Sequence, residues 1–267
     1  GELFFDNSAI HEAQKLVYST DASVYQEKPL AVAVPKTKED ITNLIAFANE
    51  HHLTLIPRAA GTSLAGQVVG NGIIVDISKY FNQILEINQE EGYVKVQPGV
   101  IRDDLNVALR PFGLMFGPET STANRAMIGG MIGNNSCGLH SIVWGDTRGN
   151  LLEVQGYLSN GQEVTFGNLS FAELAEKTTL NSLEGVIYKG VSEMVNNPSN
   201  IDAIEKGYPK KSLTRRNTGY ALDFLIPEEG KESFNMCELI AGSEGTLVFV
   251  TEAKLKLLPL PPKKDAL

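Results

Sequence analysis

Residues 31–57 restrict the fold more than any other part of the sequence. The run Ala31-Val32-Ala33-Val34-Pro35 is typical of a short β-strand that ends at a proline. Thr37 can cap a helix after it, in which Ile41, Leu44, Ile45 and Ala48 recur at helical spacing. A second apolar run, Leu53-Thr54-Leu55-Ile56-Pro57, follows. Strand, helix and strand in so few residues lie near the lower limit for a parallel βαβ crossover, so we expect a parallel sheet here.

The composition narrows the class of protein. The 267 residues can form one large domain or two lobes around a cleft, and 42% hydrophobic with 21% charged residues is ordinary for a globular chain. The net charge of -9 argues against a nucleic-acid partner, although a local basic patch is compatible with it. Cys137 and Cys237 are too few and too far apart for an iron–sulfur or zinc framework, so we expect no metal site.

The same features bear on location. Two isolated cysteines fit a reducing, cytoplasmic setting. No apolar run approaches the roughly 18–20 residues of a membrane span, and the first residues lack the pattern of a signal peptide. We therefore expect no membrane span, and peripheral attachment at an inner membrane stays open.

A glycine- and alanine-rich stretch follows the second predicted strand. It reads Arg58-Ala59-Ala60-Gly61-Thr62-Ser63-Leu64-Ala65-Gly66. Small residues let a phosphate approach the main chain, and successive N–H groups can form an anion-binding nest. The stretch has neither the Rossmann nor the P-loop spacing. Taken alone, it is compatible with a phosphate site or with a tight connection in a packed sheet.

A second glycine-rich region spans residues 117–138 and includes Gly129, Gly130, Gly133 and Gly138. So many glycines and small polar residues predict irregular backbone rather than a packed helix or a strand interior. Such backbone needs hydrogen-bond partners, which a cofactor or a structural loop could provide. Two such regions, each beside predicted strands, favour a long dinucleotide that uses both.

The remaining sequence predicts mainly antiparallel structure. Hairpins are expected at 84–97 and at 151–166, where Asn160-Gly161 forms the turn, and 171–207 is helical in character. A strand follows Gly242-Ser243-Glu244-Gly245-Thr246. We expect an α+β fold of two lobes, a small parallel α/β lobe and a larger mixed or antiparallel α+β lobe. The expected divisions are residues 1–72, residues 73–258, and residues 259–267 as the start of a linker to a C-terminal domain.

Five segments, in order, resemble the FAD-binding PCMH-type domain of vanillyl-alcohol-oxidase-like flavoproteins. They are Pro57–Gly66, Gly117–Ser121, Ile128–Gly138, Gly145–Asn150 and Gly242–Leu247. Arg215-Arg216-Asn217-Thr218-Gly219-Tyr220-Ala221-Leu222 is similar to a stretch of large members of the FAD-linked oxidase group that contains glycolate oxidase, D-lactate dehydrogenase and D-2-hydroxyglutarate dehydrogenase. The resemblance covers nearly the whole chain.

The resemblance implies that FAD lies between the two lobes. The amides of Ala60 to Ala65 would hold its pyrophosphate, residues 118–121 and 128–138 would line the isoalloxazine and ribityl parts, and 244–250 would surround the adenosine. The implied cofactor-binding residues are Arg58, Ala59, Ala60, Gly61, Thr62, Ser63, Leu64, Ala65, Gly66, Pro118, Glu119, Thr120, Ser121, Ile128, Gly129, Gly130, Asn134, Asn135, Gly138, Glu244, Gly245 and Val250.

Three departures from the family pattern matter. Ala59 and Ala60 replace glycines, so their φ angles must be negative. Thr62 stands where covalent members carry histidine, which implies non-covalent FAD. Val248 stands where the family has a glycine, so the close approach of the backbone at this position is altered.

Single residues near these motifs have two interpretations. Arg216 and Asn217 are candidates to bind a substrate carboxylate, since arginine offers a bidentate fork, but a solvated basic cluster with Lys210, Lys211 and Arg215 accounts for them as well. His140, Trp144 and Cys137 are more often structural residues than catalytic ones in such positions. We assign no catalytic residue.

By the same resemblance, the enzyme would oxidise a 2-hydroxy acid by hydride transfer to flavin N5. Electrons would then leave to another acceptor, for which an iron–sulfur region in a following part of the protein is a candidate. Two alternatives stay open. One is a flavoenzyme like UDP-N-acetylenolpyruvoylglucosamine reductase, and the other is a non-catalytic nucleotide-binding module.

Overall fold

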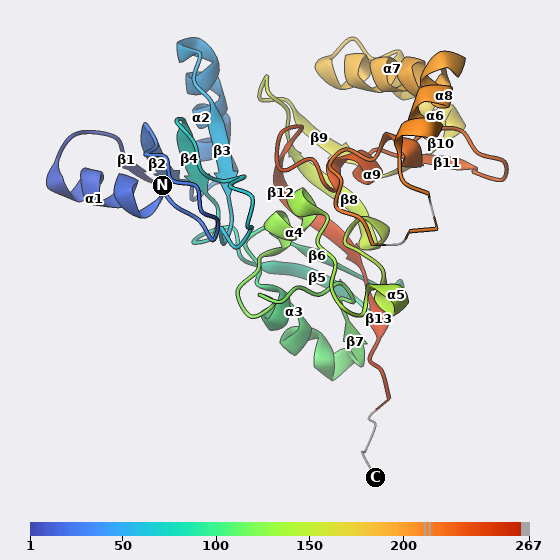
Figure 1. Cartoon of the computed structure of the whole chain (residues 1–267), viewed down its shortest axis with the longest axis horizontal. Helices are drawn as coiled ribbons and strands as arrows, with labels where there is room; N and C mark the ends of the chain where they lie inside the picture. Colours follow the sequence, from blue (N-terminus) through green and yellow to red (C-terminus); the bar gives the residue numbers. More distant parts are fainter. Residues whose placement is uncertain (211, 214, 263–267) are drawn as a thin grey trace.

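A four-stranded sheet forms the first lobe, at the blue end of the chain in Figure 1. The computed structural model describes residues 1–210, 212–213 and 215–262. The strand order is β1 (Glu2–Phe4), β2 (Ala31–Val34), β4 (Ile73–Asp76) and β3 (Leu55–Arg58). The strands β2 and β3 both run parallel to β4, which confirms the parallel sheet. The antiparallel edge strand β1, for which the sequence gives no clear pattern, pairs with β2.

The position of β4 bears on the lobe boundary. This strand lies between β2 and β3, so a division after residue 72 would cut the sheet. We propose that the first lobe extends at least through Asp76. The pairing is hard to infer from the sequence, because β4 fills the gap between two strands that are consecutive along the chain.

The helix α2 (Lys38–His51) forms as its sequence predicts. The Thr37 hydroxyl accepts a hydrogen bond from the Asp40 amide, and the Asp40 carboxylate accepts one from the Thr37 amide, a reciprocal capping box. The buried face of the helix comprises Ile41, Ile45 and Ala48, and the two isoleucines pack on the first sheet. A second helix of this lobe, α1 (Ala9–Val17), lies beside β1.

A five-stranded antiparallel sheet organises the second lobe. Its order is β5 (Ile84–Asn88), β6 (Tyr93–Val96), β12 (Phe249–Lys256), β8 (Leu151–Tyr157) and β9 (Glu163–Phe166). Both predicted hairpins are present. The other elements of this lobe are α3 (Arg102–Leu109), η1 (Arg110–Phe112), β7 (Leu114–Met115), α4 (Ile128–Asn134), α5 (Ser141–Trp144), η2 (Arg148–Asn150), β10 (Asn168–Ser170), α6 (Phe171–Thr178), α7 (Leu183–Asn196), α8 (Pro198–Gly207), η3 (Leu222–Phe224), β11 (Ser233–Asn235), α9 (Cys237–Ile240) and β13 (Leu258–Pro259).

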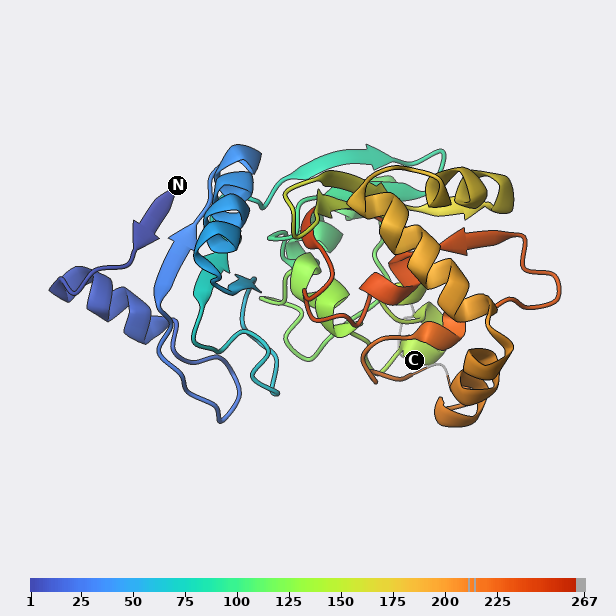
Figure 2. The same cartoon turned by 90° about the horizontal axis from the view of Figure 1, so that it is seen from above.

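The two lobes lie side by side and touch through α2 and the edge of the larger sheet, as Figure 2 shows from above. The Lys38 ammonium lies 2.7 Å from a carboxylate oxygen of Glu252, and the Asn49 side-chain amide donates to the Ser159 carbonyl at 2.6 Å. Tyr157 and Phe249 of the larger sheet are buried in the core of the smaller lobe. In the described part of the chain, no helix is long and apolar enough to cross a membrane.

Candidate functional site

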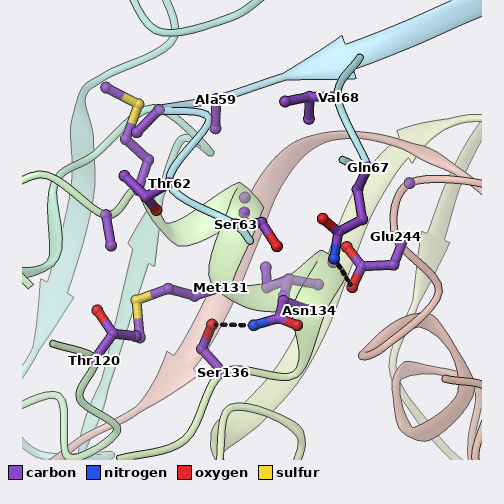
Figure 3. A pocket seen from close by; sticks show the side chains of 18 of the residues that line it. Ala59, Thr62, Ser63, Gln67, Val68, Thr120, Met131, Asn134, Ser136 and Glu244 are labelled. Carbon is purple, nitrogen blue, oxygen red and sulfur yellow. Dashed lines mark hydrogen bonds between the residues drawn. The ribbon is translucent and has the colours of Figure 1, made fainter. Parts of the chain in front are cut away.

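A cavity of about 1070 Å³ is lined by residues of both lobes. This is slightly above the usual range for ligand pockets, about 300–1,000 Å³. Its walls come from the loop after β3, from residues 119–127, from α4 with the residues that follow it, and from residues 240–250. Figure 3 shows the first of these segments facing α4.

The loop after β3 is shaped by glycines and by an arginine that packs beneath it. Gly61 and Gly66 have φ angles of 63° and 77°, whereas Ala59 and Ala60 are not among the residues with positive φ, as expected. The Arg58 guanidinium lies 5.2 Å from the centre of the Tyr18 ring, and its Nη2 atom would be 2.9 Å from a Cβ at position 61. Arg58 therefore packs between Tyr18 and the loop at Gly61.

The backbone donors of this loop are available to a ligand. In the described residues, the N–H groups of Ala60 to Ala65 donate to no protein acceptor, and residues 58–65 all line the cavity. Such groups need a partner when water is excluded, and a row of them is an anion-binding nest. The loop is therefore suited to a phosphate or pyrophosphate.

The second glycine-rich region contains a helix, which corrects the expectation of irregular backbone. Residues 128–134 form α4. A Cβ at Gly129 would lie 2.7 Å from the Pro98 ring, and one at Gly133 would lie 3.5 Å from the Cα of Glu244. Gly129 thus permits a close approach to Pro98, and this packing offsets the helix propensity cost of about 1 kcal/mol for each glycine.

The end of α4 is held by Asn217. Its side-chain amide donates to the carbonyls of Asn134 at 2.8 Å and Asn135 at 2.7 Å. The Asn217 Oδ1 atom accepts a hydrogen bond from the Cys137 thiol at 3.1 Å. Both amide donors are therefore used by the protein, and Asn217 acts as a C-terminal cap of α4.

Arg216 lies away from the cavity. Its guanidinium is buried, forms an ion pair with Asp223 and lies 4.8 Å from the centre of the Phe224 ring. The Arg216 charge is already paired with Asp223 in the interior, so Arg216 is not offered to a substrate. The adjacent Arg215 is exposed and lines the cavity. Lys211, a member of the alternative basic cluster, lies outside the described residues.

Glu119 links the wall of the cavity to His140. One carboxylate oxygen accepts from the His140 backbone amide at 3.0 Å and lies 2.6 Å from the ring Nδ1 atom. A Cβ at Gly138 would lie 2.3 Å from the Glu119 side chain, which accounts for this glycine. The His140 ring packs 4.8 Å from Trp144, and neither aromatic residue is among the described residues that line the cavity. His140 is exposed and Trp144 is half-buried, and that both are structural residues stays a prediction.

Glu244 connects the two lobes across the cavity. Its Oε1 atom accepts a hydrogen bond of 3.2 Å from the Gln67 side chain (Figure 3). Its amide donates to the Gly133 carbonyl at 2.9 Å, and its φ angle is 52°. Burial raises the pKa of the Glu244 carboxyl, against the smaller opposing effect of the Gln67 hydrogen bond.

Comparison with known proteins decides the family. The profile of a family described as "FAD binding domain" matches residues 29–167, just over half of the chain. The chain belongs to this family. FAD is therefore the cofactor of the domain, and the four cavity walls include most of the segments in which the FAD motifs were recognised.

Relatives of this FAD-binding domain are longer than the chain. D-2-hydroxyglutarate dehydrogenase of Escherichia coli K12 is 41% identical over 97% of the chain, which covers 25% of that protein. The glycolate oxidase subunit GlcD of Bacillus subtilis 168 is 33% identical over 98% of the chain, which covers 44% of it. The chain thus spans about a quarter of the length of the first relative.

A solved structure supports the fold. Alkyldihydroxyacetonephosphate synthase superposes with a TM-score of 0.63 at 17% identity, over 98% of this chain and 38% of that one. The two-lobed α+β architecture expected from the FAD-domain motifs is confirmed by this similarity and by the observed sheets.

Most residues implied as cofactor ligands line the cavity of this FAD-binding domain. They are Arg58, Ala59, Ala60, Gly61, Thr62, Ser63, Leu64, Ala65, Glu119, Thr120, Ser121, Gly129, Gly130, Asn134, Gly138, Glu244, Gly245 and Val250. Four others do not line it. Gly66 packs against Tyr25, and the Pro118 carbonyl accepts from Arg102. Ile128 is buried in the larger core, and the buried Asn135 donates to Asp146. That these four contribute to FAD binding stays a prediction.

Sequence reasoning missed several cavity residues. Gln67 and Val68 directly follow the first loop, and Arg125 lies between the two halves of the second region. Proximity to the motifs was the available signal for these three. Ala22 comes from a loop of the small lobe, and no pattern in its surroundings distinguishes it. Of the residues searched, no group of three or more His, Cys, Asp and Glu side chains could hold a metal ion.

Replacing Glu244 with glutamine is expected to stabilise the FAD-free domain at neutral pH. A raised folded-state pKa means that the folded carboxyl keeps its proton to higher pH than the unfolded one, so stability falls as pH rises between the two values. Well below the ordinary glutamate pKa of about 4.3, Glu244→Gln and the parent should therefore have nearly the same melting temperature. Above the folded-state pKa of Glu244, the melting temperature of Glu244→Gln should be the higher of the two. Equal melting temperatures throughout would contradict this. Glu90→Gln, at an exposed hairpin turn, is the control.

Proposed function

We propose that the cavity between the lobes is the FAD site of a flavoenzyme that oxidises a 2-hydroxy acid. The observation that carries the proposal is the row of free amides from Ala60 to Ala65, which faces the cavity within the segment matched by the family. The names of the relatives, D-2-hydroxyglutarate dehydrogenase and glycolate oxidase, support the hydroxy-acid substrate and favour it over the reductase alternative.

Different segments of the domain bind different parts of FAD. The amides of Ala60 to Ala65 hold the pyrophosphate, and Met131 offers an apolar side chain to the flat ring. Residues 244–250 contribute backbone and apolar side chains on the larger lobe. When bound, FAD supplies the redox chemistry, while the protein binds and orients it and excludes water. Thr62, in place of histidine, supports non-covalent attachment.

Electron transfer and location are further parts of the proposal. Electrons would leave to an acceptor outside this domain, for which an iron–sulfur region is the candidate suggested by large relatives of the group. The two free cysteines, Cys137 and Cys237, fit a reducing cytoplasmic setting, with or without peripheral attachment to the inner membrane.

Purified protein mixed with FAD and then desalted is expected to be yellow, with the visible absorbance bands of a bound flavin. Acid precipitation should release the flavin into the supernatant, because no covalent bond retains it. A protein that stays colourless after FAD is added would overturn the FAD site. Flavin that remains in the acid pellet would overturn non-covalent attachment.

A further inference from the structure

The segment Arg215-Arg216-Asn217 is fixed by its second and third residues. The Asn217 side chain is held on the end of α4 by hydrogen bonds of 2.8 and 2.7 Å. The Arg216 guanidinium is buried with Asp223 and Phe224. Two anchored neighbours in a row restrict where the backbone of Arg215 can lie. The side chain that precedes them is therefore presented to the cavity from a defined position.

Arg215 differs from the other charged side chains of the cavity. Arg58 packs under the first loop against Tyr18, and Arg125 donates to the side chain of Asn124 at 3.3 Å. The two carboxylates of the wall, Glu119 and Glu244, have partners in His140 and Gln67. In the part of the chain that the structure describes, the Arg215 guanidinium is exposed and has no hydrogen-bond or ion-pair partner.

We propose that Arg215 binds a carboxylate of the hydroxy-acid substrate, an inference that rests on the proposed function. A guanidinium with free donors matches a carboxylate through two parallel hydrogen bonds. The chain carries a net charge of -9, so an anionic substrate needs a local cation to offset the general repulsion. The pyrophosphate of FAD already has the amides of Ala60 to Ala65, on the other lobe. Arg215 takes the role that the sequence suggested for Arg216.

The test measures carboxylate binding by the FAD-loaded protein. The probe is 2-oxoglutarate, a keto acid that cannot donate a hydride, and binding is followed by the change in flavin absorbance. Arg215→Gln is expected to raise the dissociation constant by about tenfold or more, since a charge-assisted pair is lost. Lys210→Gln removes the same charge from an exposed residue that precedes this segment and does not line the cavity, and it should change the constant less than about twofold.

Each other outcome has a defined meaning. If Arg215→Gln binds 2-oxoglutarate as the parent does, or if the FAD-loaded parent does not bind it, the assignment of Arg215 is wrong. If Arg215→Gln loses FAD while Lys210→Gln keeps it, Arg215 serves the cofactor and the assignment is also wrong. A parent that takes up no FAD would instead remove the proposed function. Melting temperatures of both variants show whether the fold is preserved.

Discussion

Replacing Ala60 with aspartate is expected to abolish FAD uptake. Ala60 lies in the middle of the loop whose amides face the cavity, and its φ angle is one that any residue can adopt. A carboxylate there would stand within a few ångströms of the pyrophosphate. Repulsion between two unit charges at about 4 Å costs about 4 kcal/mol at an effective dielectric constant near 20. The dissociation constant for FAD should therefore rise by a factor of about a hundred or more.

Ala60→Asn is the matched control, because asparagine has the shape of aspartate without its charge. It should reduce FAD affinity much less than Ala60→Asp, and FAD fluorescence quenching during titration measures both constants. Equal losses in the two variants would mean that the size of the side chain, and not its charge, blocks binding. Unchanged affinity in Ala60→Asp would place the pyrophosphate elsewhere in the cavity.

The elements with strong local signals were predictable from the sequence. The helix α2 has a capping box and an apolar face that do not depend on the rest of the protein. The hairpin of β8 and β9 is set by its Asn160-Gly161 turn. The loop from Arg58 to Gly66 was recognisable because glycines, alanines and small hydroxyl residues directly follow a predicted strand. In each case the pattern and its cause lie within a few residues of one another.

Features that depend on distant contacts were not predictable. The helix α4 forms in spite of its glycines because Pro98 and Glu244 pack against them, and neither contact can be inferred from local propensity. The position of Arg216 differs from the expectation for the same reason, because Arg215 and not Arg216 lines the cavity. Asp223 draws Arg216 into the core, and only the folded chain shows which of two adjacent arginines is left at the cavity.

Replacing Arg148 with methionine is expected to destabilise the protein by about 3–5 kcal/mol, the usual cost of removing one partner from a buried charged network. The Arg148 side chain is 4% exposed. Its guanidinium donates to the Glu238 carbonyl at 2.8 Å and the Ala241 carbonyl at 2.6 Å, and lies 5.2 Å from the centre of the Phe224 ring. Methionine fills similar space but offers no donor to either carbonyl, so polar groups of a buried turn lose their partner.

The turn that Arg148 holds leads directly into residues 242–250, which form one wall of the cavity. The melting temperature of Arg148→Met should therefore fall by about 10 °C, and FAD affinity should fall with it. Arg110→Met removes an exposed arginine outside the FAD cavity and should stay within about 0.5 kcal/mol of the parent in urea unfolding. A stable Arg148→Met with weakened FAD binding would show that Arg148 positions the wall without supporting the fold. Unchanged stability and affinity would mean that the two carbonyls find other donors when the guanidinium is removed.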